Sequence, residues 1–377
     1  MVEGSRERLR EALKENVVSI LKHYPPAKRE DPSLYTGSLG IYAALRRVLA
    51  HEGALGMDVP ELKMHTNSYL EHAKKSISQS SAAKRYTLHC GDAGILTYLE
   101  LYSSPDLNNQ KMLCGFLPEV LKDSFESNEV LYGRTGYLCA LLPLYMKEGS
   151  LVDDHIVSPL VTRIMEEGYK LGTKECPLNY AWHGKEYWGA AHGLVGIFYT
   201  LLHQKIFQNF ILKNEKWRKD LIQSMDYLCG MLGSDGSFPS RLKGSNLTQW
   251  CHGPTGMVFL MCRAYQTLND EKYRKAAILS AQAIWAKGFL TKGGGLCHGI
   301  SGNAYALLAV YKVTEDVDYL HQALQFAVAY AQSDISRYFA VPDRPYSLYE
   351  GKSGMVSLYV DLLVDPKNAT MPGYQDL

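Results

Sequence analysis

The sequence predicts an all-α protein made of seven repeats, with apolar inner helices and amphipathic outer helices in two concentric layers. The word Gly-x-x-Gly, followed by an apolar helix-forming run, occurs seven times at intervals of 42 to 60 residues. Repeats of this period are typical of architectures in which each unit is a helical hairpin that cannot bury its apolar face alone. The strand signal is weak, because few alternating Val/Ile/Thr runs are bounded by turn pairs.

The predicted inner helices start at the glycine words. In order these are GSLGIYAALRRVL from Gly37, GDAGILTYLELY from Gly91, GRTGYLCALLPLY from Gly133, GLVGIFYTLL from Gly193, GPTGMVFLMCRAY from Gly253, GISGNAYALLAVY from Gly299 and GKSGMVSLYVDLL from Gly351. Glycine lacks a β-carbon, so it permits unusual dihedral angles and close approach of neighbouring backbones. If these helices run parallel around a closed ring, their starts surround one opening, where helix N-termini favour thiolates and other anions.

The predicted outer helices lie between these words and carry more charge. The first is the N-terminal helix, with Leu9, Leu13, Val17, Ile20 and Leu21 on one face, and later examples are KYRKAAILSAQAIWAKGF from Lys272 and VDYLHQALQFAVAYAQ from Val317. Seven such segments alternate with the seven apolar ones, which places the apolar set inside. We expect residues 1–377 to form a single domain.

Charge and composition narrow the function classes. Forty basic against 39 acidic side chains give a net charge of +1, so no global field recruits nucleic acid, and we expect small-molecule or protein partners. The longest apolar run, 137–146, is far shorter than the roughly 20 residues of a transmembrane helix, and the N-terminus lacks a signal-peptide core. Eight dispersed cysteines then favour reduced thiols and metal ligation in a cytoplasmic protein. Peripheral membrane association stays open.

The residues at the predicted opening are rich in reactive side chains. Directly before the first glycine of each word stand Thr36, Cys90, Tyr132, His192, His252, His298 and Glu350. Cys251 and Cys297 precede the histidines of the fifth and sixth words, so we expect their side chains to converge, with His298 or His252 as the third ligand of one Zn²⁺ per chain. The alternative is local packing of buried cysteine and histidine.

Other reactive positions admit two interpretations each. His192 could be a general acid or base, or could cap the helix behind it. Lys292 could pair with a substrate carboxylate or be a solvated loop lysine. Arg134 could bind an anion or a helix C-terminus. Aromatic residues such as Trp182 and Tyr187 could wall a cleft or belong to an ordinary core.

The motifs AHGLVG at Ala191, WCHGPTG at Trp250, LCHGISGNAY at Leu296 and PYSLYEGKSG at Pro345, together with the seven glycine words, resemble the eukaryotic LanC-like proteins. These are relatives of bacterial lanthionine cyclases, and the resemblance spans nearly the whole chain. It implies a double-layered α/α toroid of seven inner and seven outer helices. It also implies that Cys251, Cys297 and His298 hold the zinc, with His252 beside the metal, and that His192 is an acid/base candidate.

The chain departs from the bacterial pattern at two places. A tyrosine occupies the position of His252 in bacterial members. Those enzymes also use an aspartate near the third repeat, and no counterpart is evident here, because Leu131 and Tyr132 precede that repeat's first glycine.

The resemblance further implies glutathione binding, for which Lys292 is a contact candidate. A basic residue expected just before Pro-Asp is absent, since Ala340 and Val341 stand there, but Arg344 follows closely and is the second candidate.

The function implied is an enzyme that resembles a glutathione transferase. The glutathione thiol would add to dehydroalanine or dehydrobutyrine residues in peptides or proteins, giving a thioether, with His192 or His252 as proton donor. The alternative is a non-catalytic glutathione- and zinc-binding scaffold with signalling-protein partners. Thiol prenylation is a further possibility on this type of fold, although no strong isoprenoid-pocket signal is present.

Overall fold

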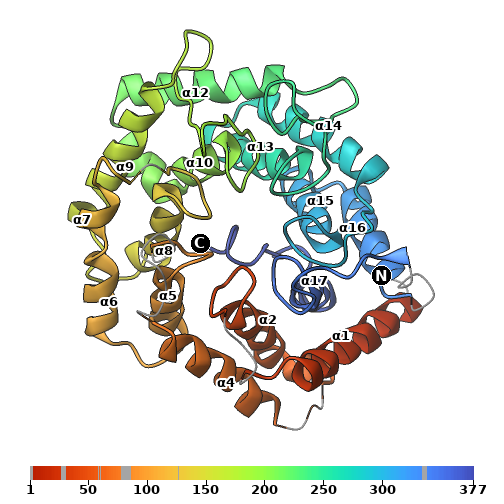
Figure 1. Ribbon diagram of the computed structural model, residues 1–377. Helices are drawn as coiled ribbons and strands as arrows, with labels where there is room; N and C mark the ends of the chain where they lie inside the picture. The colour runs from red at the N-terminus through yellow and green to blue at the C-terminus, as the bar shows by residue number, and fades with distance from the viewer. Residues whose placement is uncertain are drawn as a thin grey trace. The chain divides into compact units, whose positions relative to one another are not determined.

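The computed structural model describes residues 3–26, 31–57, 59, 61–77, 86–125, 127–332 and 338–377. Within these ranges the regular structure is helical, and β-pairing is limited to two isolated bridges. This confirms the all-α prediction, and Figure 1 labels the helices. In the same ranges, no helix combines the length and apolarity needed to cross a bilayer.

Seven helices begin at the glycine words, as predicted. They are α2 (Ser38–Ala50), α5 (Asp92–Tyr102), α8 (Arg134–Tyr145), α10 (Leu194–Leu201), α13 (Pro254–Leu268), α15 (Ile300–Thr314) and α17 (Lys352–Val364). Their residues are buried on all sides rather than on one stripe; α15, for example, buries each residue from Ile300 to Val310. Such burial is what an inner layer requires.

Seven helices of the amphipathic set alternate with them. They are α1 (Glu3–His23), α4 (Leu62–Lys75), α6 (Leu107–Cys114), α9 (Asp154–Tyr169), α12 (Glu215–Gly230), α14 (Glu271–Lys287) and α16 (Val317–Tyr330). Shorter pieces are α3 (Glu52–Leu55), α7 (Leu117–Val120), α11 (Gln204–Ile206) and the π-helix η3 (Phe207–Ile211). In α9 the buried residues Val157, Leu160, Val161 and Ile164 recur at helical spacing on one face.

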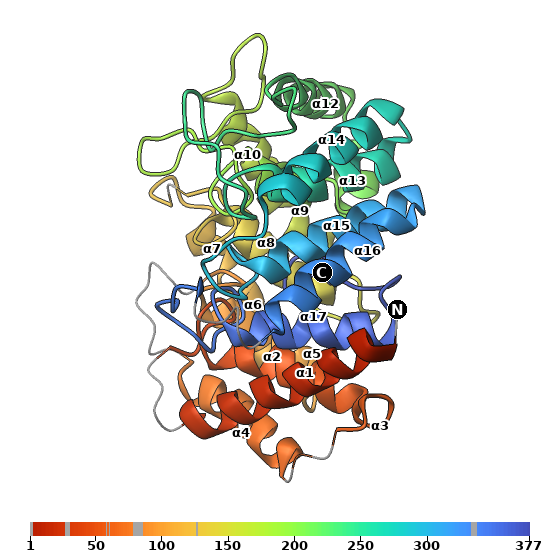
Figure 2. The ribbon, with the colours of Figure 1, turned by 90° about the vertical axis from the view of Figure 1, so that its right-hand side faces the viewer.

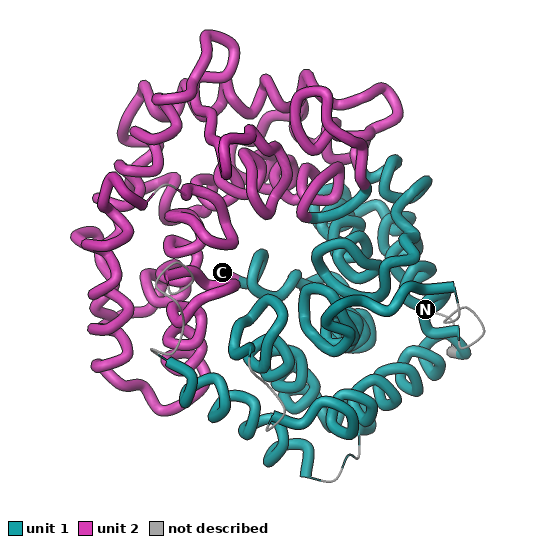
Figure 3. The backbone as a smooth tube through the Cα atoms, viewed as in Figure 1, with its two compact units in different colours: residues 1–77, 248–250, 281–376 teal, residues 78–247, 251–280, 377 magenta. Residues whose placement is uncertain are grey.

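The chain divides into two compact units (Figure 3). One comprises residues 1–77, 248–250 and 281–376, and the other comprises 78–247, 251–280 and 377. In the first unit, α17 packs against both α1 and α2, so the last repeat lies beside the first (Figure 2). In the second unit, α8 packs against α5, α9 and α10, and α10 packs against α13. That 1–377 form one domain stays a prediction.

The glycine joints are places of close backbone approach. A β-carbon on Gly94 would lie 1.9 Å from the carbonyl oxygen of Leu88, and one on Gly302 would lie 1.9 Å from that of Leu296. The preceding loop is therefore folded directly under the first turn of each of these helices, where only glycine fits.

The same folding changes the electrostatics expected at the helix starts. In α8 the first-turn N–H groups of Arg134, Thr135 and Gly136 donate to carbonyls of residues 127 to 129, and Ser38 and the next two residues of α2 are bonded in the same way. These N–H donors are already used by the chain itself. The expectation that the inner-helix N-termini provide open anion sites is therefore wrong for these helices.

Backbone hydrogen bonds join neighbouring joints. The N–H of Trp250 donates to Cys297 O at 2.9 Å, that of Cys297 to Tyr349 O at 2.8 Å, and that of Tyr349 to Tyr35 O at 3.1 Å. The last of these bonds joins the seventh repeat to the first. Cys297, Tyr349 and Tyr35, each two places before its first glycine, are thus held in register, and in the fifth repeat the donor is the residue before Cys251.

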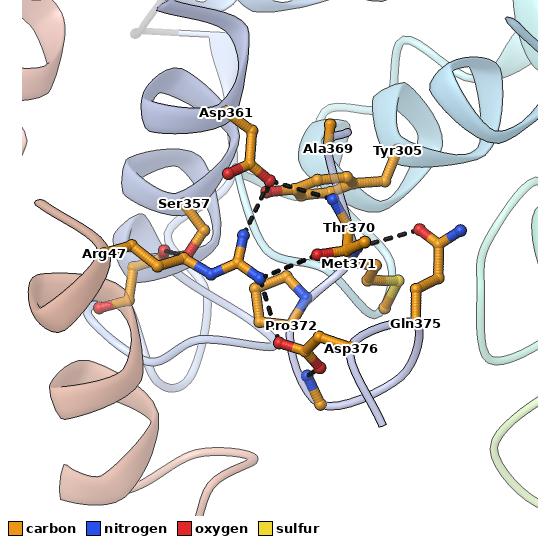
Figure 4. A network of polar contacts seen from close by, with 12 residues as sticks. Arg47, Tyr305, Ser357, Asp361, Ala369, Thr370, Met371, Pro372, Gln375 and Asp376 are labelled. Atoms are coloured by element: carbon orange, nitrogen blue, oxygen red, sulfur yellow. Dashed lines mark hydrogen bonds and ion pairs between the residues drawn. The ribbon is translucent and has the colours of Figure 1, made fainter. Parts of the chain in front are cut away.

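The C-terminal segment is anchored by a half-buried arginine (Figure 4). Arg47 of α2 donates to Asp361 Oδ2 at 2.8 Å, to Asp376 Oδ2 at 3.1 Å and to Thr370 Oγ1 at 3.3 Å. The hydroxyl of Tyr305 also donates to Asp361 Oδ2, at 2.8 Å. This network fixes residues 370–376 against α2, α15 and α17.

Candidate functional site

Two cysteines and a histidine form a group that could hold a metal ion. The ligand atoms of Cys251, Cys297 and His298 all lie within 4.8 Å of one another. Cys251 and Cys297 are only 8% and 3% exposed, and the cysteines, all of which lie in the described ranges, are reduced. The hydrogen bond from Trp250 to Cys297 explains the convergence, because Cys251 is the residue after Trp250.

The donor set suits zinc. Zn²⁺ takes thiolate at about 2.3 Å and imidazole at about 2.0–2.1 Å, so its ligand atoms lie roughly 3–4 Å apart in a tetrahedral site. Donor atoms already within 4.8 Å need only small side-chain adjustments to reach that spacing. Three protein donors would leave a fourth position for a small ligand, which is the pattern of catalytic zinc sites.

Charged residues surround His298 in its own unit. A hydrogen bond with Cys297 raises the pKa of His298 against the effect of burial, and Glu350 raises it further while Lys292 lowers it. Burial raises the pKa of Glu350, and the charges of His298 and Arg344 lower it. Lys292 and Arg344 are both exposed; the charge of Lys292 acts on His298, and that of Arg344 acts on Glu350.

The loops that carry these two cations pack together. The N–H of Ala340 donates to Thr291 O at 2.7 Å, and a β-carbon on Gly293 would meet Pro342 at 2.8 Å. Gly293 itself has φ 97°, which favours glycine. The glycine run after Lys292 therefore lets the 291–295 loop lie against the loop that leads to Arg344.

His192 is paired with a buried carboxylate that the sequence analysis missed. Its Nδ1 lies 2.8 Å from Glu129 Oε2, and the Glu129 side chain is 2% exposed. A carboxylate only accepts hydrogen bonds, so Nδ1 carries the proton and Nε2 is left for other chemistry. Gly193 begins α10 without a side-chain cap, so the alternative in which His192 caps this helix is wrong.

Glu129 is held rigidly. Its carboxylate accepts from the N–H of Leu131 at 2.9 Å, the N–H of Tyr132 at 2.6 Å and the hydroxyl of Ser127 at 3.0 Å. A carboxylate therefore does stand near the third repeat, four residues before Gly133. The signal in the sequence was its position, since Ser33, Thr87 and Ser347 occupy the same place in other repeats.

His252 has a different environment from His192. Its ring lies 6.2 Å from that of His192 and 5.5 Å from that of Tyr187, and its Nδ1 is buried without a hydrogen-bond partner in the described part of the chain. Burial, with a contribution from His192, lowers the pKa of His252 to about 4. His252 is therefore neutral near pH 7, and it is not a member of the Cys-Cys-His group.

Arg134 serves the structure. It is buried and donates to Val120 O at 3.0 Å, to Lys122 O at 2.9 Å and to Asn128 Oδ1 at 3.0 Å. Two of these acceptors are carbonyls at the end of α7, which confirms the interpretation that Arg134 binds a helix C-terminus.

A family model described as "Lanthionine synthetase C-like protein" matches residues 28–375. The chain belongs to this family. Two relatives of this LanC-like chain cover most of its length. Glutathione S-transferase LANCL1 of Danio rerio is 29% identical over 367 residues, which cover 92% of this chain and 87% of that protein. LanC-like protein GCL1 of Arabidopsis thaliana is 31% identical over 377 residues, with 92% and 81% covered.

A solved structure shows the fold of this LanC-like chain. Nisin cyclase superposes with a TM-score of 0.71 at 17% identity, covering 93% of this chain and 94% of that one. The fold is therefore the α/α toroid, as the resemblance implied, and it agrees with the two layers predicted from the repeats. Likeness at this identity concerns the fold, so the chemistry has to be argued from the site residues.

Proposed function

We propose that this chain is a zinc-dependent enzyme that adds the thiol of glutathione to dehydroalanine or dehydrobutyrine residues in peptides or proteins. The observation that carries the proposal is the Cys251, Cys297 and His298 group, whose donor atoms lie within 4.8 Å. A relative named glutathione S-transferase, 29% identical over most of both chains, supports the choice of thiol.

The thiol must be presented as a thiolate, which is the nucleophilic form. Zn²⁺ held by Cys251, Cys297 and His298 would supply the positive charge that favours this form. Glutathione also carries two carboxylates, and the exposed cations Lys292 and Arg344 are the proposed contacts for them. Their proximity to His298 and Glu350 is seen in the electrostatic effects on both groups.

The addition forms one bond between sulfur and the β-carbon of the acceptor and breaks the carbon–carbon π bond. The electron pair moves onto the α-carbon and its carbonyl, and a proton must then be delivered to the α-carbon. We assign this delivery to Nε2 of His192, which regains its proton from solvent. The proton lost by the thiol and the proton gained by the α-carbon balance, and no oxidant or reductant is required.

His192 suits this role better than His252. Its Nδ1 is bound to the Glu129 carboxylate, which stabilises a positively charged imidazole. His252 has a pKa lowered to about 4, so near neutral pH it lacks the proton that an imidazolium acid gives up. The role left for His252 is to line the site between Tyr187 and His192.

The test uses the full chain loaded with zinc, glutathione and a dehydroalanine-containing peptide, with the adduct followed by mass spectrometry. We expect adduct formation well above the uncatalysed rate, and a loss of about 10²–10⁴-fold in His192→Gln. Metal content should fall in Cys251→Ala and Cys297→Ala and stay unchanged in Cys262→Ala, a buried cysteine of α13 outside the group.

Two outcomes would contradict the proposal. A zinc-loaded protein that binds glutathione without accelerating the addition would favour the scaffold alternative with protein partners. Undiminished zinc in both cysteine variants would remove the metal site itself.

A further inference from the structure

Trp182, at the start of an exposed turn, stacks on the face of the His192 ring. The indole of Trp182 and the imidazole of His192 lie with ring centroids 3.9 Å apart and planes 2° apart. Trp182 is only half-buried, and the three residues that follow it are exposed. A tryptophan that served the core alone would be buried among apolar side chains, whereas this one stacks on a polar ring.

The turn has the geometry of a tight hairpin. The N–H of Trp182 donates to Lys185 O at 2.9 Å, and the N–H of Lys185 donates to Trp182 O at 3.1 Å. His183 and Gly184 between them have φ 49° and φ 70°, so both are left-handed, as a two-residue type I′ turn requires. Asn179 Nδ2 donates to Glu186 Oε2 at 2.9 Å and ties the two arms of the loop together. The position of Trp182 is thus set by local backbone bonds.

The surroundings of His192 restrict what its ring can do. Nδ1 is held by Glu129, and the ring of Tyr132 lies 6.2 Å away at an angle of 11°, nearly parallel to both His192 and Trp182. The rings of Tyr187 and His252 lie 6.3 Å and 6.2 Å away and are tilted. With one edge bound and one face covered, rotation of the imidazole is blocked and Nε2 keeps a single direction.

We propose that Trp182 is a positioning residue for His192, which holds the imidazole plane by stacking on the face of the ring. Aromatic faces attract cations, so this contact is stronger for imidazolium than for the neutral ring. Trp182 acts through His192 and does not exchange protons itself. The inference rests on the proposed function only for its kinetic consequence, because the stacking has a readout of its own.

The first arm of the test measures tryptophan fluorescence of the full chain between about pH 8 and pH 5, the range in which imidazole side chains titrate. A protonated imidazole stacked on an indole quenches its emission. We expect a quenching step in the wild type and in the control Trp285→Phe, which removes a 41% exposed tryptophan of α14. The step should be absent from Trp182→Phe and from His192→Gln. It should persist in His183→Gln, which removes the other imidazole beside the indole, 4.4 Å away between ring centroids. An unchanged step in Trp182→Phe would overturn the proposed contact.

The second arm measures the glutathione addition. We expect Trp182→Ala to lower kcat about three- to tenfold with KM within twofold, and Trp182→Phe to restore most of the loss because a parallel ring is kept. Wild-type kcat in Trp182→Ala would overturn the positioning role even with the stack present. If the wild type shows no turnover, the proposed function fails, and the fluorescence arm alone decides whether Trp182 holds His192. Thermal unfolding within a few degrees of the wild type verifies that each variant is folded.

Discussion

Replacing Glu129 by glutamine is the sharpest test of the histidine pair, because the side chain keeps its shape and loses its charge. The carboxylate makes four contacts, with Ser127 and Tyr132 on Oε1 and with Leu131 and His192 on Oε2. Glutamine offers one oxygen and one NH₂ group in their place. The variant must therefore give up part of this set.

The cost follows from those contacts. With its oxygen at the Oε2 position, glutamine still accepts from Leu131 and His192, but its NH₂ group then faces the N–H of Tyr132. A buried donor without an acceptor costs about 1–3 kcal/mol of stability. The bond to His192 survives as a neutral one, and losing the charge assistance costs about 1 kcal/mol. If imidazolium is the acid, kcat falls about five- to tenfold.

The assay is a double-mutant cycle on kcat for glutathione addition. Since Glu129 acts through His192, the double variant Glu129→Gln with His192→Gln should be no slower than His192→Gln alone. Glu166→Gln, an exposed carboxylate of α9, is the matched control and should behave as wild type. If the two losses multiply instead, Glu129 acts independently of His192, and the assignment of the pair is refuted.

Three further predictions concern stability, each measured by urea unfolding. Gly94→Ala places a β-carbon 1.9 Å from a carbonyl oxygen and should cost about 3 kcal/mol or more, whereas Gly230→Ala, with nothing within 4 Å, should gain up to about 1 kcal/mol. Equal effects would contradict the close-approach argument. Arg47→Met removes the cation beside Asp361, whose side chain is 15% exposed, and should cost about 3–5 kcal/mol; a cost under about 1 kcal/mol would contradict the anchoring role. Burial lowers the pKa of His203 to about 4, against about 6.5 in the unfolded chain. The neutral His203 therefore contributes roughly 3 kcal/mol of folding stability above about pH 6.5, and this contribution is lost as the pH falls towards 4. His203→Gln should flatten that slope, and an unchanged slope would contradict it.

The inner helices could be predicted from sequence because the physics behind them is periodic and local. Each joint needs glycine where a loop carbonyl takes the place of a β-carbon, as at Gly94 and Gly302, and this need leaves a visible word in the sequence. The uninterrupted apolar residues that follow each glycine word predict a helix that is buried on all sides. The joint hydrogen bonds that hold Trp250 to Cys297 leave no such word, because a backbone bond requires no particular side chain.

The convergence of the two cysteines with a histidine could be predicted for a related reason. Cys251 and Cys297 occupy the same place in adjacent repeats. A regular repeat brings such residues together, so their convergence can be predicted without knowing the detailed structure of the repeat. Spacing alone left His252 and His298 as equal candidates, and the resemblance to a family was needed to choose between them. The structure groups His298 with the cysteines and gives His252 an aromatic neighbour in Tyr187.

Glu129 and Trp182 could not be found this way, because their roles do not repeat. The residue four places before the first glycine caps its joint in several repeats: Ser33 accepts from the N–H of Thr36, and Thr87 from that of Cys90. The single oxygen of a hydroxyl is used up in accepting this backbone N–H. Glu129 performs the same task for Tyr132 through Oε1, and its second oxygen remains for His192. A single carboxylate thus serves both as the cap of its joint and as the partner of His192. A carboxylate at a position that serine or threonine holds in three of the other repeats is the mark to seek in other chains built on this joint.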